Sequence, residues 1–349
     1  MLTDEDTLKV NVLIATSIAI RFDMYKNVVV GLSKENKEQT VELNPDSDST
    51  KYIQEVQALL ASKVLGTMGG YPSYLKRWSR MGQVSSANLK SLLMIGNIEA
   101  VVAVANSNNL DSETCELVWW CATNTDHQAE VGMFLLNRDF VVKHQVGTKI
   151  ADFLLEFLPF TTDILNQIDT TNLILQGSLI SDSDKDKLWK QGQRKTAILV
   201  GFIERMQGRL PNTNNTFELK CGEPMLDPAC SLQGQILLKT IQHILNKINQ
   251  EYVLYRTLEV LGQFLSHPKI YKLETIDQLQ EQSKNFIEGL EFGTTKAKVE
   301  SLLLLAGVSE RLVVGTISAH GLAGSAIRKK LSNVLTPIQD ALVLLTAPQ

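Results

Sequence analysis

Apolar residues recur at helical spacing through residues 97–160. Ile98, Val101 and Ala105 fall at i, i+3 and i+7, which predicts a first amphipathic helix. Asp111 can accept hydrogen bonds from the free amides of a second helix, and two further apolar segments follow before Pro159 ends the run. Helical segments of roughly 10 to 15 residues joined by short polar loops predict stacked helical hairpins.

The predicted fold class is therefore mainly α. The helices could form a HEAT- or armadillo-like stack or an irregular α domain, and no exact repeat period separates the two. The pattern changes near the N-terminus, where residues 19–32 are alternating and β-branched. A polar tip at residues 33–37 separates this run from a second one at residues 40–43, which predicts a small β hairpin.

Proline, glycine and asparagine residues, which favour turns and loops, predict a division of the chain into four segments. They are an N-terminal unit with a helix and the β hairpin (1–82), a helical stack (83–207), a loop or linker (208–229) and a C-terminal helical unit (230–349). The linker is too rich in proline and asparagine for a helix or a central strand. Beyond it, apolar residues at steps of three and four from 237 to 255 predict a long helix or a helical hairpin.

Two adjacent tryptophans lie on the second of these predicted helices. Trp119 and Trp120 point about 100° apart, so they must face different surroundings. Trp119 shares an apolar stripe with Cys115 and Val118, and we expect it to be the more buried, a core residue. Trp120 is a candidate contact residue, because aromatic side chains often anchor partners. The alternative is that both pack between adjacent helices.

Composition limits where the chain acts. Its 34 Lys and Arg against 38 Asp and Glu give a net charge of −4, so any attraction to nucleic acid or to an anionic membrane must be local. The acidic N-terminal residues are unlike a signal peptide, and nothing reaches the roughly 20 apolar residues of a membrane span. Four cysteines do not make a disulfide framework, which predicts reduced thiols and a cytoplasmic location without membrane insertion.

The first of two basic clusters interleaves aromatic rings with cations. It contains Lys76, Arg77, Trp78 and Arg80, a composition that can stack bases and contact phosphates. The alternative is a short amphipathic helix whose rings pack while its cations stay in water.

The second basic cluster follows a group of acidic residues. Lys187, Lys190 and Arg194 lie at i, i+3 and i+7, hence on one helix face that could form a small anion site. Aspartates at 182, 184 and 186 precede them, and acids before bases is also how an ordinary helix offsets its dipole.

No catalytic constellation is apparent in the sequence. A Walker motif, a dinucleotide fingerprint and a Gly-x-Ser-x-Gly elbow are all missing, and no two of the five histidines lie within one helical turn. We therefore predict no enzymatic activity, no catalytic residues, no cofactor and no metal. Cys221 and Cys230 flank a flexible insert and are the best redox candidates, but no CxxC motif or adjacent cation activates them, which favours two inert thiols.

Several short phrases of the sequence are similar to those of one protein family. The phrases are MLTDEDTL at 1–8, the turn at 64–72, YLKRW at 74–78, AVVAV at 100–104, WW at 119–120, LEFLPF at 155–160, LISD at 179–182, LW at 188–189 and RK at 194–195. In these phrases the chain resembles the DsrS proteins of sulfur-oxidising bacteria. The phrases cover roughly the first 205 residues, and none of them is a catalytic motif.

The resemblance implies a soluble cytoplasmic protein encoded with the reverse-acting dissimilatory sulfite reductase system, regulating expression or assembly of that machinery. It carries over no site residues. The first functional hypothesis is a non-enzymatic accessory or regulatory protein that binds proteins of the sulfur-oxidation machinery through a helical surface. The second is an RNA-binding post-transcriptional regulator, which requires the two basic clusters to share one face. The third is a thiol-dependent sulfur-handling protein using Cys221 and Cys230. The oligomeric state is left open.

Overall fold

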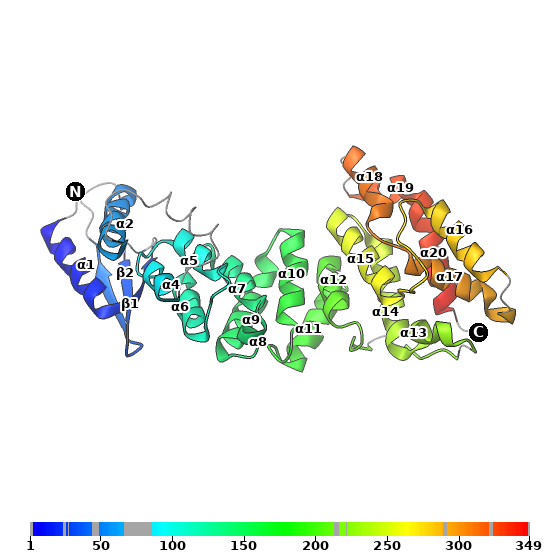
Figure 1. Ribbon diagram of the computed structural model, residues 1–349, viewed down its shortest axis with the longest axis horizontal. Coiled ribbons are helices and arrows are strands. Elements are labelled where there is room, and N and C mark those ends of the chain that lie inside the picture. Colours follow the sequence, from blue (N-terminus) through cyan, green and yellow to red (C-terminus); the bar gives the residue numbers. More distant parts are fainter. Residues whose placement is uncertain are drawn as a thin grey trace. The chain divides into compact units, whose positions relative to one another are not determined.

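The computed structural model describes residues 3–23, 26, 28–43, 49–65, 86–212, 216–220, 222–288, 292–320 and 324–347. Over these residues the protein is mainly helical with an N-terminal antiparallel sheet, which confirms the predicted fold class (Figure 1). The chain forms two compact units, Met1–Phe157 (unit 1) and Leu158–Gln349 (unit 2). The four segments inferred from the sequence stay a prediction.

The sheet of unit 1 has three strands in the order β1-β2-β3. Helix α1 (Asp4–Thr16) leads directly into β1 (Ser17–Asp23), which pairs with β2 (Val28–Ser33), and β2 pairs with β3 (Glu38–Glu42). The predicted hairpin is the β2–β3 pair. Its tip contains Asn36 at a φ of 58°, a conformation that asparagine tolerates better than most residues. Strand β1 extends this hairpin to a three-stranded sheet.

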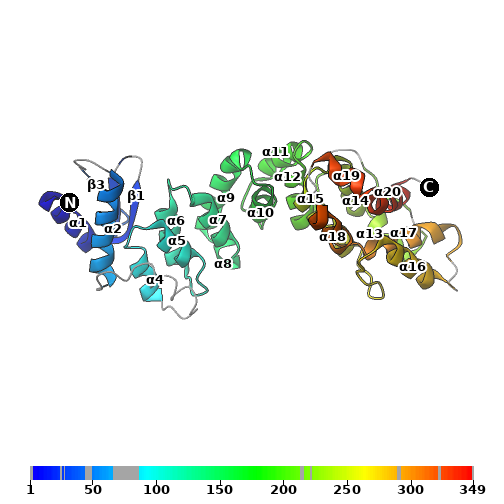
Figure 2. The same ribbon diagram turned by 90° about the horizontal axis from the view of Figure 1, so that it is seen from above.

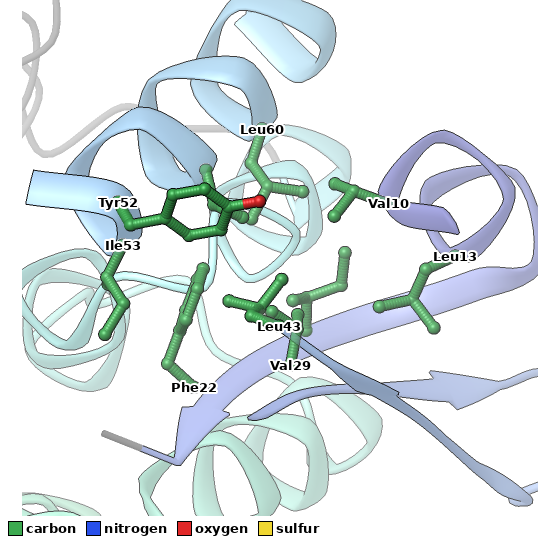
Figure 3. Packing of buried hydrophobic residues seen from close by; sticks show 10 residues of the cluster. Val10, Leu13, Phe22, Val29, Leu43, Tyr52, Ile53 and Leu60 are labelled. Atoms are coloured by element: carbon green, nitrogen blue, oxygen red, sulfur yellow. The ribbon is translucent and has the colours of Figure 1, made fainter. Parts of the chain in front are cut away.

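One face of the sheet is covered by α1 and by α2 (Ser49–Leu65). Because successive strand residues point to opposite faces, Ile20 and Phe22 of β1 both enter the core on this side. Figure 3 shows the side chains of this core meeting between the two helices and the strands. The cluster consists of Val10, Leu13, Ile20, Phe22, Val29, Leu43, Tyr52, Ile53, Val56 and Leu60.

The rest of unit 1 is a run of short helices (Figure 2). They are α4 (Ser86–Leu92), α5 (Ile98–Ala105), α6 (Ser112–Ala122), α7 (Gln128–Leu136), α8 (Asp139–Val142) and α9 (Gln145–Phe157). Neighbours pack on one another, α5 on α6, α6 on α7 and α7 on α9. The predicted N-cap Asp111 is confirmed, since its carboxylate accepts the Thr114 amide at 2.7 Å.

The side chain of Trp119, on α6, packs against α7 and α9. Its ring meets Phe153 edge to face at 5.5 Å and approaches Gly132, which leaves room for it. The expectation that Trp119 is an enclosed core residue is wrong, because both tryptophans are only half-buried. The Phe153 ring beside Trp119 in turn stacks on the exposed Phe157, so this aromatic group lies at the surface of the unit.

Unit 2 opens with η1 (Leu158–Phe160), α10 (Ile164–Ile174), α11 (Asp182–Gly192) and α12 (Thr196–Arg205). Helix α12 crosses α10 closely at Gly201 and also packs against α15 (Glu251–Phe264). Charges join the same three helices: the Arg256 guanidinium of α15 bonds the Glu204 carboxylate of α12 and lies 3.1 Å from an Asp169 carboxylate oxygen of α10. Burial raises the pKa of Asp169 above its ordinary value, although the nearby arginine opposes this shift.

The C-terminal part of unit 2 is a bundle of helices. It contains η2 (Pro224–Leu226), α13 (Asp227–Cys230), α14 (Leu232–Lys247), α15, α16 (Ile276–Ile287), η3 (Gly293–Thr295), α17 (Lys296–Ala306), α18 (Arg311–His320), α19 (Ser325–Lys330) and α20 (Ser332–Thr346). Helix α20 packs against both α14 and α17, so the last helix returns to the middle of the unit. The apolar seam from 237 to 255 is the α14–α15 hairpin, as predicted.

The linker predicted at 208–229 is partly helical. Helices η2 and α13 occupy residues 224–230, so the expectation that this stretch forms no helix is wrong there. Pro224 is the first residue of η2 and Pro228 the second of α13, positions in the first turn where the backbone amide has no partner within the helix.

No single helix in the described part of the chain is long and apolar enough to span a membrane. The pair Gly293–Ala306 and Arg311–Ser318 passes on length and composition together, but it bends by 55°. Leu303, Leu305 and Val313 of this pair are fully buried within the protein.

Candidate functional site

Helix α1 is apolar on both faces. Its inner face places Val10 and Leu13 in the core, whereas Leu8 and Val12 on the outer face are 66% and 54% exposed. Leu8, Val12 and the exposed Ala15 fall at i, i+4 and i+7, so they form one line along the helix. We call these three residues the outer stripe.

The outer stripe is held on a well-anchored helix. The Thr3 hydroxyl caps α1 by accepting the Asp6 amide at 3.1 Å, and the buried Asp6 carboxylate accepts a hydrogen bond from the Tyr52 hydroxyl of α2. An ion pair of Glu5 and Lys9, 2.7 Å apart, lies on the first turns of the same helix. The arrangement is an exposed apolar line beside charged side chains.

The candidate contact residue Trp120 packs on the sheet face opposite α1. Its indole N–H donates to the Glu38 carboxylate of β3 at 2.7 Å, and the Arg21 guanidinium of β1 lies 4.4 Å from its ring centre. Arg21 also donates to the Trp120 carbonyl oxygen at 3.0 Å and to Glu38 at 3.1 Å. The ring face and the N–H are therefore engaged within unit 1, and they fasten α6 to the sheet.

The structure brings together two members of the second basic cluster. Lys190 and Arg194 line a hollow of about 490 Å³ together with Lys195, Pro159 and Gln191, and no carboxylate lies among these described lining residues. Helix α11 ends at Gly192, so the expectation that Arg194 lies on the same helix face as Lys187 and Lys190 is wrong. Arg194 and Lys195 both follow the end of the helix. We call Lys190, Arg194 and Lys195 the basic hollow.

Lys187 does not join the basic hollow. It pairs with Asp184 at 2.9 Å, and hydrogen bonds from Ser181 and Lys187 hold the pKa of Asp184 below its ordinary value. Ser181 accepts the Asp184 amide at 3.2 Å and so caps the start of α11. Lys187 therefore belongs to the ordinary charge pattern of a helix start.

The first basic cluster, Lys76, Arg77, Trp78 and Arg80, lies outside the described residues. Whether it shares a face with Lys190 and Arg194 stays a prediction.

The cysteines fall into two classes. Cys115 and Cys121 are free and buried, as expected of core thiols, and burial raises their pKa values to about 11 and about 12. Cys230 is 4% exposed and disulfide-bonded, so the expectation of a reduced, inert thiol is wrong at this position. Cys221 lies outside the described residues.

The outer stripe was missed by sequence reasoning, although a signal for it is present. Leu8, Val10, Val12 and Leu13 are too widely spread around a helix to share one face, so some of them had to be exposed. Comparisons with family models, curated proteins and solved structures found no match to this chain. The geometry of the surface and the family resemblance are therefore the basis for assigning a function.

Proposed function

We propose that this protein is a non-enzymatic accessory or regulatory protein of dissimilatory sulfur oxidation that acts by binding a protein partner. The observation that carries the protein contact is the outer stripe of α1, an apolar line that the described chain leaves exposed. The resemblance to DsrS proteins supports the pathway.

The outer stripe has the physical properties that a partner can use. Covering a fully exposed leucine or valine is worth about 1.5 to 3 kcal/mol, and Leu8 and Val12 retain more than half of their exposure. Because the Thr3 cap and the Asp6–Tyr52 bond already hold α1 in place, binding does not have to order the helix first. An apolar partner segment with charges that match Glu5 and Lys9 fits this surface.

Affinity purification from sulfur-oxidising cells tests the proposal. We expect the wild-type protein to recover a component of the sulfur-oxidation machinery. Leu8→Lys and Val12→Lys together should reduce that recovery by about tenfold or more, since 1.4 kcal/mol is a factor of ten. The matched control is Val343→Lys on α20 of unit 2, an exposed valine that is 51% accessible and should have no effect. Equal recovery by both variants, or a wild-type sample without any protein of the pathway, would count against the proposal.

A second candidate function is RNA binding through the basic hollow. Lys190, Arg194 and Lys195 surround one hollow without a carboxylate among its described lining residues, which suits a phosphate backbone. If RNA binds there, Lys190→Gln and Arg194→Gln together should weaken binding and flatten its dependence on salt. Lys187→Gln, which removes a cation already paired with Asp184, is the control.

A further inference from the structure

A cavity of about 510 Å³ opens beside β1 in unit 1. Its apolar wall includes Ile20 and Phe22 of β1 and Val101 of α5, while Gln57 of α2 and Glu99 of α5 supply polar groups. This volume is in the range of sites for small organic molecules, and polar side chains of the α5 and α6–α7 regions form much of the remaining wall.

The two loops that form the cavity have fixed conformations. Gly96, before α5, has a φ of 70°, and a side chain there would place its Cβ 2.5 Å from the Phe22 ring. Asn124, between α6 and α7, has a φ of 62°. Its backbone N–H donates a hydrogen bond to the side-chain oxygen of Gln128 at 2.9 Å. The close approach of Gly96 to the Phe22 ring and the bond between Asn124 and Gln128 tie both loops to the rest of unit 1.

The charges around the cavity favour a cation. Strand alternation turns the Arg21 side chain to the opposite sheet face, where Glu38 and the Trp120 carbonyl hold its guanidinium. The Cys121 thiol that lines the cavity is uncharged at neutral pH, because burial raises its pKa to about 12. Arg21 also lines the cavity, but its charge is paired with Glu38. The negative charges of the lining are the carboxylates of Glu99 and Asp126.

His127 also lines the cavity, but a carboxylate outside the lining accompanies it. Its Nδ1 lies 2.8 Å from a Glu130 oxygen. The Nδ1 atom of His127 is therefore already engaged by a carboxylate of α7.

We propose that this cavity is a binding site for a small organic amine, with the hydrocarbon body against Ile20, Phe22 and Val101 and the ammonium group at Glu99. The Phe22 ring offers the hydrocarbon body apolar contact. The site is independent of the partner contact, because the cavity and the outer stripe are formed by different residues and each can be removed without the other.

Three probes with the same hydrocarbon body and different head groups test the ligand class. They are 2-phenylethylamine, 2-phenylethanol and phenylacetate, each titrated into the full-length protein by calorimetry and by NMR of the isoleucine methyl groups. We expect the amine to bind at least about tenfold more tightly than the alcohol or the acid. The methyl resonances of Ile20 and Ile98 should shift, while that of Ile338 in α20 should not.

Matched variants locate the site. Glu99→Gln should weaken amine binding by about tenfold and leave the weak binding of the alcohol unchanged. Glu116→Gln, at an exposed carboxylate of α6 outside the lining, should do neither. Ile98→Trp, which fills the cavity from a half-buried position, should abolish binding while circular dichroism and the melting temperature confirm folding. No binding of the amine at millimolar concentration, equal affinity for the three probes, or unchanged amine affinity in Glu99→Gln would overturn the proposal.

Discussion

A single buried carboxylate fixes the position of α1. Asp6 is 1% exposed, and its carboxylate accepts the hydroxyl of Tyr52, whose ring extends from α2 toward α1 in Figure 3. A buried carboxylate is costly unless its oxygens are hydrogen-bonded, so this bond stabilises the packing of α1 against α2.

Removing the hydroxyl should therefore destabilise unit 1. We expect Tyr52→Phe to lower the free energy of unfolding by about 1 to 3 kcal/mol, the cost of leaving a buried polar group short of a partner. Urea unfolding followed by circular dichroism measures it. Tyr271→Phe, at a tyrosine that is 68% exposed, is the control and should change stability little.

Tyr52 should also make the stability of unit 1 depend on pH in the alkaline range. Burial, and then the hydrogen bond to Asp6, raise the pKa of Tyr52 above its ordinary value of 10.0. Above pH 10 the unfolded chain therefore loses this proton before the folded protein does, which favours unfolding. The contribution of Tyr52 is complete below pH 10 and declines as the pH rises beyond it. The stability gap between wild type and Tyr52→Phe should narrow over that range, and a constant gap would contradict this reading.

The free thiols should be unreactive in the folded protein. Cys115 and Cys121 are buried with pKa values of about 11 and about 12, so almost none of the reactive thiolate is present at pH 8. We expect iodoacetamide at pH 8 to label neither residue until denaturant is added, and to label Cys230 only after reduction. Peptide mass spectrometry reads each site separately, and rapid native labelling of Cys121 would show that its environment is open.

At the scale of elements, the close crossing of α10 and α12 depends on a glycine, Gly201, which has no side chain to keep the helices apart. A Cβ at Gly201 would lie 2.6 Å from the Cβ of Thr171 and 2.7 Å from the Ile168 carbonyl oxygen. Neither of those atoms is the flexible end of a side chain, so the helices would have to separate.

Two glycine substitutions should therefore have opposite effects. We expect Gly201→Ala to destabilise unit 2 by about 1 to 3 kcal/mol, as overpacking does. Gly315→Ala on α18 is the control, because a Cβ there meets no atom within 4 Å and alanine favours a helix over glycine by about 1 kcal/mol. Thermal melts of the two variants should shift in opposite directions, and a stabilised Gly201→Ala would refute the close crossing.

Local signals predicted elements well, and distant contacts escaped prediction. The caps at Asp111 and Ser181 were predictable because donor and acceptor lie three residues apart. The partner of the Trp120 indole, Glu38, lies 82 residues away in the sequence, so no helical or strand period could reveal it. The helical turns at 224–230 were missed because proline argues against helix in general but is accommodated in the first turn.

For the whole molecule, the candidate surfaces lie in different units. The outer stripe and the cavity beside β1 belong to unit 1, whereas the basic hollow belongs to unit 2. The sequence pointed to Lys190 and Arg194 of the basic hollow through their helical spacing, although α11 ends at Gly192 and Arg194 lies in the turn that follows. It did not distinguish the exposed from the buried apolar residues of α1, because that depends on which face the sheet and α2 cover.

The central claim is that the outer face of α1 contacts a protein of the sulfur-oxidation machinery. Photo-crosslinking in sulfur-oxidising cells with Val12→benzoylphenylalanine tests this contact directly, with Val343→benzoylphenylalanine on α20 as the control. We expect a crosslinked product at position 12 that mass spectrometry identifies as a protein of this pathway, and no such product at position 343. The absence of a pathway protein at position 12, or the same product from both positions, would contradict the claim.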